Sequence, residues 1–296
     1  MRAVKVIATC FKPKRVVEKT TLTGDPLGYF WHSQNFTSTE DIINLLKFHI
    51  DLEKNSSPGF DRDIIIVNSN VDDVIGNSFI NDIDQSDIPG GKVFCLNREN
   101  KGLSFGAYND AFQNFKNDYD YFLFTEDDVV IFQDNYMKIG VDILNKNKKN
   151  GFVAYVGVTK IHKNHWDELG LTKDTAYSCH GAIGISSKNV LEEVSQKYGC
   201  LPHFKENNYL KSITFGEVAF PNSILQLGYN LVDQPKDLML GLPAYDVMRG
   251  INFKKYPNIL EIIIYKLKNQ LYKIASTTKL TLKIYLRIIS YLKRKS

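Results

Sequence analysis

Three consecutive carboxylates, Glu126, Asp127 and Asp128, follow the apolar run of residues 121–124, with one threonine between. Adjacent carboxylates repel one another and are costly to bury without a cation. Mg²⁺ or Mn²⁺ removes this cost, because such ions bind carboxylates together with phosphate oxygens. The alternative is a solvated turn, in which the three acids stabilise the N-terminus of the next helix. Their position after an apolar run favours a metal site, to which a nucleoside diphosphate would supply phosphate oxygens.

A second group of residues is the glycine-containing segment 97–109, with the sequence NRENKGLSFGAYN. Gly102 and Gly106 let the backbone approach a ligand closely or adopt a positive φ. The segment leads into a predicted helix, and a helix N-terminus attracts anions such as phosphate. It contains neither the Gly-Lys-Ser/Thr of a P-loop nor the GxGxxG of a dinucleotide site. We expect Asn100, Gly102 and Gly106 to line a nucleotide site.

The elements that must position these residues alternate between short apolar runs and helical patterns. This alternation predicts an α/β fold with a mostly parallel sheet and helices on both faces. Ser38 or Thr39 is the expected N-cap of the first helix. The predicted strands are 4–10, 63–68, 92–96, 119–125, 152–158 and 182–185, and the predicted helices are 39–52, 106–115, 187–198 and 213–227.

Ligands of such sheets bind at the carboxyl ends of the strands. Thr9 and Phe11 lie at the end of the first predicted strand, and Asn68 ends the second. We therefore expect these three residues to share one crevice with the segment 97–109 and the acidic triplet. An amide such as that of Asn68 can read a base edge through its donor and its acceptor.

The order of strand, N-x-x-N-x-G-x-x-x-G-x-x-N, helix, apolar strand and acidic triplet resembles the inverting family 2 glycosyltransferases, which have the GT-A fold. The resemblance covers residues 97–130 well and residues 4–185 loosely. It implies a Rossmann-like GT-A sheet, a nucleotide-diphosphate sugar as donor, with uridine as the default base, and Mn²⁺ or Mg²⁺ as cofactor. It also implies that Asp128 is the principal metal ligand, that Glu126 is a second ligand close to the donor, and that Asp127 lies near the ribose and phosphates.

The same resemblance implies a general base, since an inverting transfer must remove a proton from the acceptor hydroxyl. Glu217 takes the place of the second acid in the family's late E-D motif, and Gly216 replaces the first acid. His180 precedes a predicted strand and is expected to contact a phosphate or a sugar hydroxyl, although a structural histidine is an equal alternative. Asn68 stands where relatives often carry aspartate, which leaves the base identity open.

The C-terminal segment 251–296 carries eleven Lys or Arg residues and one acid, whereas the whole chain has a net charge of only +4. Residues 258–275 and 279–294 have apolar positions at helical spacing with basic residues between them. Basic amphipathic helices of this kind bind anionic membrane surfaces. Docking on the catalytic domain or on a second subunit is the alternative. We expect a GT-A-type domain at 1–250 and a basic helical region at 251–296.

Composition places further limits on the function. The four cysteines are far apart and form no CxxC pair, which disfavours a zinc site or a disulfide framework. No stretch holds the roughly 20 apolar residues of a membrane span, and no signal peptide is evident. We expect a cytoplasmic protein, soluble or peripheral on the inner face of a membrane, with a glycan or lipid-linked glycan as acceptor. A homo-oligomer is compatible with the sequence, whereas nucleic acid is not an expected partner, because aromatic residues do not form a stacking platform.

Two other functions fit the same fold. A sugar-phosphate nucleotidyltransferase would need a glycine-rich basic loop after the first strand, but residues 11–19 contain no glycine. A non-catalytic membrane-associated scaffold would account for the departures at Asn68 and Gly216.

Overall fold

The computed structural model describes residues 1–11, 38–131, 133–160, 177–203, 212, 215–235 and 242–243. The predicted C-terminal helices lie outside these ranges. In the part of the chain that is described, no helix is long and apolar enough to cross a bilayer.

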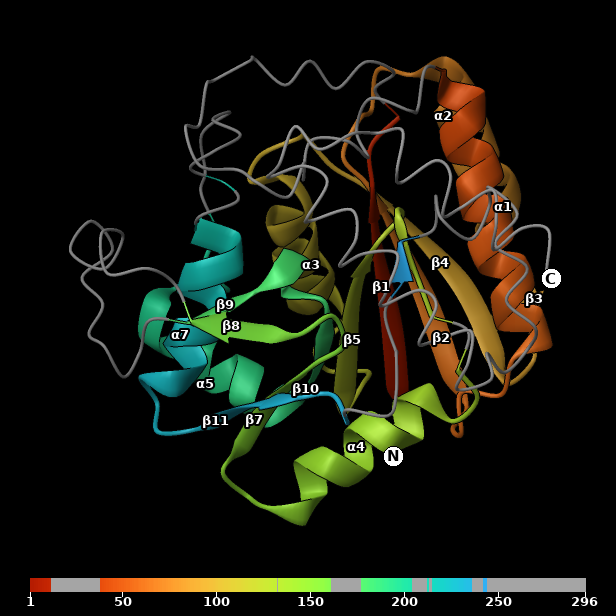
Figure 1. Cartoon of the computed structure of the whole chain (residues 1–296). Helices are drawn as coiled ribbons and strands as arrows, with labels where there is room; N and C mark the ends of the chain where they lie inside the picture. The colour runs from red at the N-terminus through yellow and green to blue at the C-terminus, as the bar shows by residue number, and fades with distance from the viewer. Residues whose placement is uncertain are drawn as a thin grey trace, which may run out of the picture.

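A large sheet forms the centre of the fold (Figure 1). The strands are β1 (Ala3–Thr9), β2 (Arg62–Asn68), β3 (Asp87–Ile88), β4 (Gly91–Asn97), β5 (Tyr121–Glu126), β6 (Val129–Val130), β7 (Asn150–Ala154), β8 (Val158–Lys160), β9 (Tyr177–Cys179), β10 (Gly184–Ser187), β11 (Asn230–Asp233) and β12 (Leu242–Pro243). Eight of them form one sheet in the order β11-β7-β10-β5-β1-β2-β4-β3. All eight run in the same direction except β10 and β3. The predicted mostly parallel α/β fold is confirmed.

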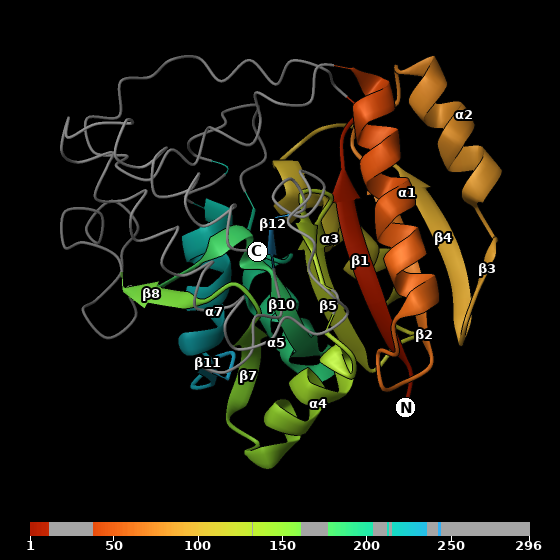
Figure 2. The same ribbon diagram turned by 45° about the vertical axis from the view of Figure 1, so that its right-hand side comes forward.

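Helices cover both faces of this sheet (Figure 2). They are α1 (Thr39–Asn55), α2 (Val74–Ile83), α3 (Leu103–Phe115), α4 (Tyr136–Lys146), α5 (Lys188–Tyr198) and α7 (Phe220–Leu225), with a 3₁₀ turn η4 (His180–Ala182) and a π-helical turn η5 (Phe215–Ala219). One core joins α3, α5 and α7 to one face, and two further cores join α1, α2 and α4 to the other. Because both faces are covered, every residue of β1 and β2 is buried, as is typical of parallel strands.

The register of the strands brings the predicted site segments to one edge of the sheet. Thr9 at the end of β1 pairs with Asn68 at the end of β2, and Asn68 pairs with Asn97 at the end of β4. On the other side of β1, Ala8 pairs with Glu126 at the end of β5. The described parts of the predicted crevice are therefore neighbours along the carboxyl edge of the sheet.

Helix α1 begins where the sequence predicts. The Ser38 side chain accepts a hydrogen bond from the Asp41 backbone N–H, and the Asp41 side chain accepts one from the Ser38 N–H. Such a reciprocal capping box satisfies two N–H groups that the helix leaves unpaired. Ile42, Leu46 and Ile50 on one side of α1 are buried against the sheet, and each contributes roughly 1.5–3 kcal/mol by leaving water.

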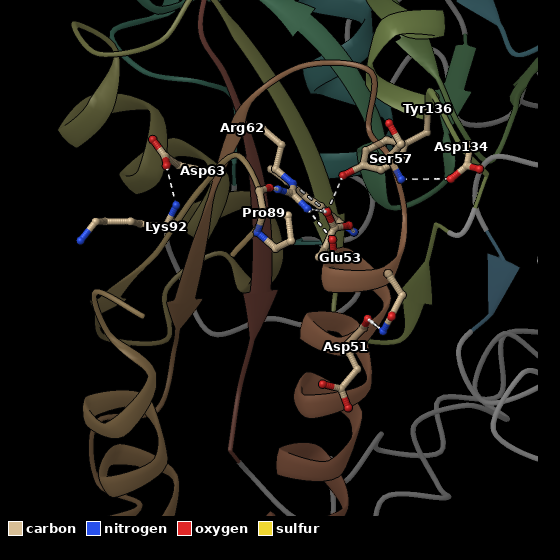
Figure 3. A network of polar contacts seen from close by, with 11 residues as sticks. Asp51, Glu53, Ser57, Arg62, Asp63, Pro89, Lys92, Asp134 and Tyr136 are labelled. Carbon is tan, nitrogen blue, oxygen red and sulfur yellow. Dashed lines mark hydrogen bonds and ion pairs between the residues drawn. The ribbon is translucent and has the colours of Figure 1, made fainter. Parts of the chain in front are cut away.

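A buried ionic network joins α1 to the sheet (Figure 3). Glu53 is fully buried, and its carboxylate lies 2.8 Å from Lys5 Nζ of β1 and 2.8 Å from Arg62 Nη2 of β2. The Tyr136 hydroxyl of α4 donates a third bond of 2.8 Å. Burial alone would raise the pKa of Glu53, but the charges of Lys5 and Arg62 hold it below its ordinary value. The network fixes α1 against β1, β2 and α4.

A segment near residue 243 lies beside the strand that follows the acidic triplet. Strand β12 pairs with β6, so that Leu242 and Pro243 lie opposite Val130 and Val129, just after Asp128. Residues 242 and 243 therefore pair with the strand that directly follows the acids, while the predicted boundary at residue 250 stays a prediction. The four cysteines are free thiols.

Candidate active site

Asp127 is fixed at three points. Its backbone N–H donates to the carbonyl of Ala8 (3.0 Å), and its Oδ2 accepts a hydrogen bond from the Thr9 hydroxyl (2.7 Å). The imidazole Nε2 of His49 lies 2.6 Å from the Asp127 carbonyl oxygen. Only 2% of Asp127 is exposed. The structure thus brings the two predicted site residues Thr9 and Asp127 together, in an arrangement that anchors the acidic turn.

Asp128 differs from Asp127 because one of its carboxylate oxygens lacks a partner. Asp128 Oδ1 is buried without a hydrogen bond, as is the amide oxygen of Asn100, whose Nδ2 lies 3.8 Å from Cys10 Sγ. A buried polar atom left in this state costs about 1–3 kcal/mol or more. Oxygen atoms of carboxylates and amides are ligands of hard divalent cations. The residues therefore fit a cation bound at Asp128.

The described residues do not supply a complete metal cage. Among them, no three His, Cys, Asp or Glu side chains converge as a metal-binding group. A cation at Asp128 would accordingly take ligands from phosphate oxygens and water, which is how proteins commonly bind Mg²⁺.

Glu126 is held by the first turn of α3. The Ser104 hydroxyl donates to Glu126 Oε1. One turn further along α3, burial and then the charges of the acidic triplet raise the pKa of Tyr108 well above its ordinary value. Its phenol therefore stays protonated and donates to the carbonyl of Gly181 (3.3 Å). Helix α3 thus links Glu126 to the turn that contains Gly181.

The turn η4 brings Glu126, His180 and Glu217 into one cluster. The Gly181 N–H donates to Glu217 Oε1 (2.9 Å), and His180 Nδ1 lies 3.3 Å from the same oxygen. Gly181 has a φ of +58°, and a Cβ there would lie 3.2 Å from Glu126 Oε2. Glu126 and Glu217 therefore both lie close to the Gly181 backbone. Ala182 also has a positive φ of 47°, an uncommon conformation for a residue with a side chain, and one that is concentrated at functional sites.

Glu217 is carried by the π-helical turn η5, a type of turn that is frequent at functional sites. The turn packs tightly on α3, because a Cβ on Gly216 would lie 1.9 Å from the Phe105 ring. An acidic side chain at position 216 has no space there. This contact gives a physical reason for the glycine that replaces the first acid of the family motif.

Asn68 is fully buried, and its amide is used within the protein. Its Nδ2 donates to the Asn70 carbonyl and to the side-chain oxygens of Asn77 and Asn97, each at 3.0 Å. Its Oδ1 accepts from the Asn70 N–H at 3.0 Å. The residue that the sequence suggested for base recognition therefore holds the ends of β2 and β4 together.

Phe11 is also a core residue. Its ring is fully buried and packs against Gly76 of α2, where a Cβ would lie 2.3 Å from the ring. The side chain that we expected beside the nucleotide is thus enclosed by α2.

Gly102 and Gly106 shape the turn between β4 and α3. Gly102 is the N-cap of α3 and has a φ of +77°. A Cβ on Gly106 would lie 2.0 Å from the carbonyl oxygen of Lys101, which accepts a hydrogen bond from Arg98 Nη2 (2.6 Å). Both glycines are therefore required by the backbone, and α3 begins one turn earlier than predicted.

Ser104, Tyr108 and His49 lie near the acids and were not singled out from the sequence. Ser104, Tyr108 and Gly181 make the contacts of the Glu126 cluster, and His49 bonds to Asp127. His49 carried a usable signal, because it lies among the apolar positions of the α1 pattern. Burial, followed by the charge of Lys5, lowers the pKa of His49 to about 3, so the ring is neutral and its Nε2–H is the donor to Asp127.

A pocket of about 500 Å³ lies beside β9 and β11, at the end of the sheet opposite β3. Tyr177, Asn230 and Asp233 are among its lining residues. Tyr177 belongs to β9, which leads directly into His180, so one strand connects the pocket with the turn that contacts Glu217.

Comparisons with known proteins give similarity at the level of solved structures. No family model and no curated protein matches the chain. A mannosyltransferase, PcManGT from Pyrobaculum calidifontis in complex with GDP-Man and Mn²⁺, is 11% identical with a TM-score of 0.49, covering 99% of this chain and 79% of that chain. A putative glucose-1-phosphate thymidylyltransferase from Bacillus anthracis is 13% identical with a TM-score of 0.42, covering 86% and 98% of the two chains. The galactosyltransferase LgtC, in complex with donor and acceptor sugar analogs, is 9% identical with a TM-score of 0.37, covering 88% and 81%.

Glycosyltransferases and nucleotidyltransferases thus both occur among the similar structures. At 9% to 13% identity, these similarities concern the fold alone.

Proposed function

We propose that this chain is a metal-dependent, inverting glycosyltransferase that moves a sugar from a nucleotide-diphosphate donor to a hydroxyl of a glycan or lipid-linked glycan. The observation that carries the proposal is the unpartnered buried oxygen of Asp128, at the same edge of the sheet as Glu126. A second carboxylate, Glu217, accepts a hydrogen bond from Gly181, whose backbone also lies close to Glu126. A cation site beside a carboxylate base is the minimum that this reaction requires.

In this proposal the donor diphosphate lies over the carboxyl edge of β1, β4 and β5. Asn100 and the glycine-bounded start of α3 face the phosphates, whose charge the N-terminus of α3 favours. Asp128 holds the cation, and Glu126, oriented by Ser104, is its neighbour. The cation, when bound, stabilises the charge that develops on the leaving nucleoside diphosphate.

Glu217 is the proposed base. Its Oε1 is engaged by the Gly181 N–H and lies near His180, whereas no described residue bonds to its Oε2, and the side chain is 22% exposed. The Oε2 atom takes the proton of the acceptor hydroxyl as that oxygen bonds to the anomeric carbon. The bond between this carbon and the phosphate oxygen breaks at the same time, and its electron pair leaves with the nucleoside diphosphate. We propose that the acceptor approaches from the pocket beside β9.

The test compares Asp128→Asn and Glu217→Gln with the wild type and with Asp72→Asn, which changes an exposed carboxylate near the same edge. Purified protein is titrated with Mn²⁺, and donor turnover is followed with UDP- and GDP-sugars. We expect Asp128→Asn to lose Mn²⁺ binding. Glu217→Gln should keep Mn²⁺ binding and lose about 10²–10⁴-fold in kcat, the usual contribution of a general base. Asp72→Asn should behave as the wild type.

The products separate the two transferase functions. A glycosyltransferase releases a nucleoside diphosphate, whereas a nucleotidyltransferase releases pyrophosphate from a nucleoside triphosphate and a sugar phosphate. Pyrophosphate release would replace the proposed function by the second one. Failure of the intact protein to bind any nucleoside diphosphate with Mn²⁺ would favour the non-catalytic scaffold.

A further inference from the structure

The buried His49 of helix α1 contacts the acidic turn. His49 is on the sheet-facing side of α1, is 1% exposed, and places its Nε2 2.6 Å from the carbonyl oxygen of Asp127. That carbonyl belongs to the peptide unit between Asp127 and Asp128. Rotation of this peptide unit would redirect the Cα–Cβ bond of Asp128, and a hydrogen bond to its oxygen opposes the rotation.

The helix that carries His49 is itself fixed. Glu53 lies one turn further along the same face of α1 and joins Lys5, Arg62 and Tyr136 in the buried ionic network (Figure 3). His49 therefore has a rigid support, and a side chain on a rigid element fixes its partner more accurately than one on a loop.

Two described bonds to β1 hold other groups of Asp127. The N–H and the carboxylate of Asp127 are fixed by Ala8 and Thr9 of β1. Both bonds are made on the N-terminal side of the peptide unit that leads to Asp128. The His49 bond acts on this unit directly, because it is made to the carbonyl oxygen of the unit.

We propose that His49 is a positioning residue that fixes the Asp127–Asp128 peptide unit and thereby directs the unpartnered oxygen of Asp128 toward the divalent cation. The inference rests on the proposed function, because it assumes that Asp128 binds the cation. His49 touches neither the cation nor the donor in this role. Partners that orient metal ligands in this way typically change metal affinity by about 10–100-fold when they are altered.

The experiment uses the full chain and measures Mn²⁺ affinity by calorimetry or by the EPR signal of free Mn²⁺, without donor or acceptor. His49→Gln places an amide N–H near the position of Nε2, whereas His49→Asn is too short to reach the carbonyl. His49→Phe keeps a ring without any donor. Leu46→Ala, at a fully buried position on the same helix, is the control for loss of stability alone. Asp128→Asn is measured in parallel, and thermal unfolding is recorded for every variant.

We expect His49→Asn and His49→Phe to bind Mn²⁺ about 10–100-fold more weakly, and His49→Gln to stay within a few-fold of the wild type. Leu46→Ala should lower the melting temperature and leave Mn²⁺ affinity unchanged. Donor turnover of the two weakened variants should recover when Mn²⁺ is raised, since the cation site is displaced rather than removed.

Unchanged Mn²⁺ affinity in folded His49→Asn or His49→Phe, with Asp128→Asn deficient, would overturn the positioning role alone. Equal Mn²⁺ binding by the wild type and Asp128→Asn would instead overturn the proposed function. If neither His49→Asn nor His49→Phe folds while His49→Gln does, the hydrogen bond to the Asp127 carbonyl is a requirement of the fold, and the positioning role is rejected.

Discussion

His49 links the charge state of one side chain to the stability of the molecule. Its pKa is lowered to about 3 by burial and by Lys5, whereas a histidine in an unfolded chain has a pKa of about 6.5. Between these two values the unfolded state binds a proton that the folded state does not. The free energy of unfolding therefore falls as the pH falls, by up to about 1.4 kcal/mol per pH unit.

We predict that His49→Gln flattens this dependence between pH 6.5 and about 4.5. Chemical denaturation of the metal-free wild type and variant, at pH intervals across this window, measures the slope. Glu53 does not contribute there, because its folded pKa lies below its ordinary value, so the stability that depends on its charge is lost only at lower pH. Parallel slopes for the two proteins would show that His49 is not the group that titrates.

Gly216 offers a second prediction at the scale of a residue. A methyl group at this position overlaps the Phe105 ring, and overpacking of this kind typically costs about 1–3 kcal/mol. Gly216→Ala should be destabilised accordingly, as measured by chemical denaturation. The double variant with Phe105→Ala should be less destabilised than the sum of the single variants, since it removes the overlap. Strict additivity would mean that the contact does not explain the glycine.

The reason for a glycine at position 216 could not be predicted from the sequence. The sequence identified a missing acid, but the reason lies in Phe105 of α3, a residue far away along the chain. The acidic triplet and the strand ends were predictable because apolar runs mark parallel strands, and parallel strands end at one edge. The roles of Asn68 and Phe11 depend on burial against α2 and on neighbouring asparagines, and local spacing does not encode these contacts.

Among the elements, the predicted strands agree with the structure within a few residues, whereas α2 and α4 were not predicted. The buried residues of α4 include Met137, Val141 and Leu144, which have helical spacing, so a signal was present. Helix α2 buries only Gly76 and Ile80 and exposes Val74, which leaves no clear apolar side to recognise. Predicted strand 152–158 is divided between β7 and β8.

The late predicted helix, residues 213–227, also differs from expectation. In the described part it is a π-helical turn followed by the short helix α7, with Pro221 in the first turn of α7. Proline lacks the backbone N–H that would continue the hydrogen-bond pattern from the preceding turn. The change from π-helical to α-helical geometry falls between Ala219 and Phe220, two residues after Glu217.

Among the contacts between helices and strands, we expect the network around Glu53 to have a large effect on the free energy of unfolding. Glu53→Gln would leave Lys5 and Arg62 buried opposite a neutral amide, and breaking a buried ion pair by removing one partner costs about 3–5 kcal/mol. Asp51→Asn, on the exposed side of the same helix (Figure 3), should change stability by no more than about 0.5 kcal/mol. Urea unfolding of both variants measures the difference. Equal stabilities would show that the network does not fix α1.

At the scale of the whole molecule, the proposed site draws on segments from both halves of the chain. The cation position depends on β1, α1 and β5, whereas the base depends on η4 and η5. The order of motifs in the sequence anticipated the first group. It did not anticipate that Gly181 would lie close to both Glu126 and Glu217, because these contacts arise only when β10 inserts between β5 and β7.

The basic segment 251–296 would hold the proposed site at a membrane surface. We propose that it binds the anionic inner face of a membrane and keeps the enzyme peripheral there, close to a lipid-linked acceptor. A chain ending at residue 250 retains β12 and its pairing with β6, so the boundary predicted from the sequence leaves the described fold intact. The prediction is that this shorter chain folds with unchanged donor turnover toward a soluble acceptor.

Sedimentation with vesicles tests the role of the segment. The full chain should bind vesicles that contain phosphatidylserine and release them as salt is raised, because the Debye length falls from about 10 Å at 0.1 M to about 3 Å at 1 M. The chain 1–250 should stay in the supernatant. A full-length variant with Lys279, Lys283 and Arg287 replaced by glutamine should bind more weakly while its apolar positions are kept. Equal binding by all three proteins would contradict the membrane role, and a lower melting temperature of the chain 1–250 would favour docking of the segment on the catalytic domain.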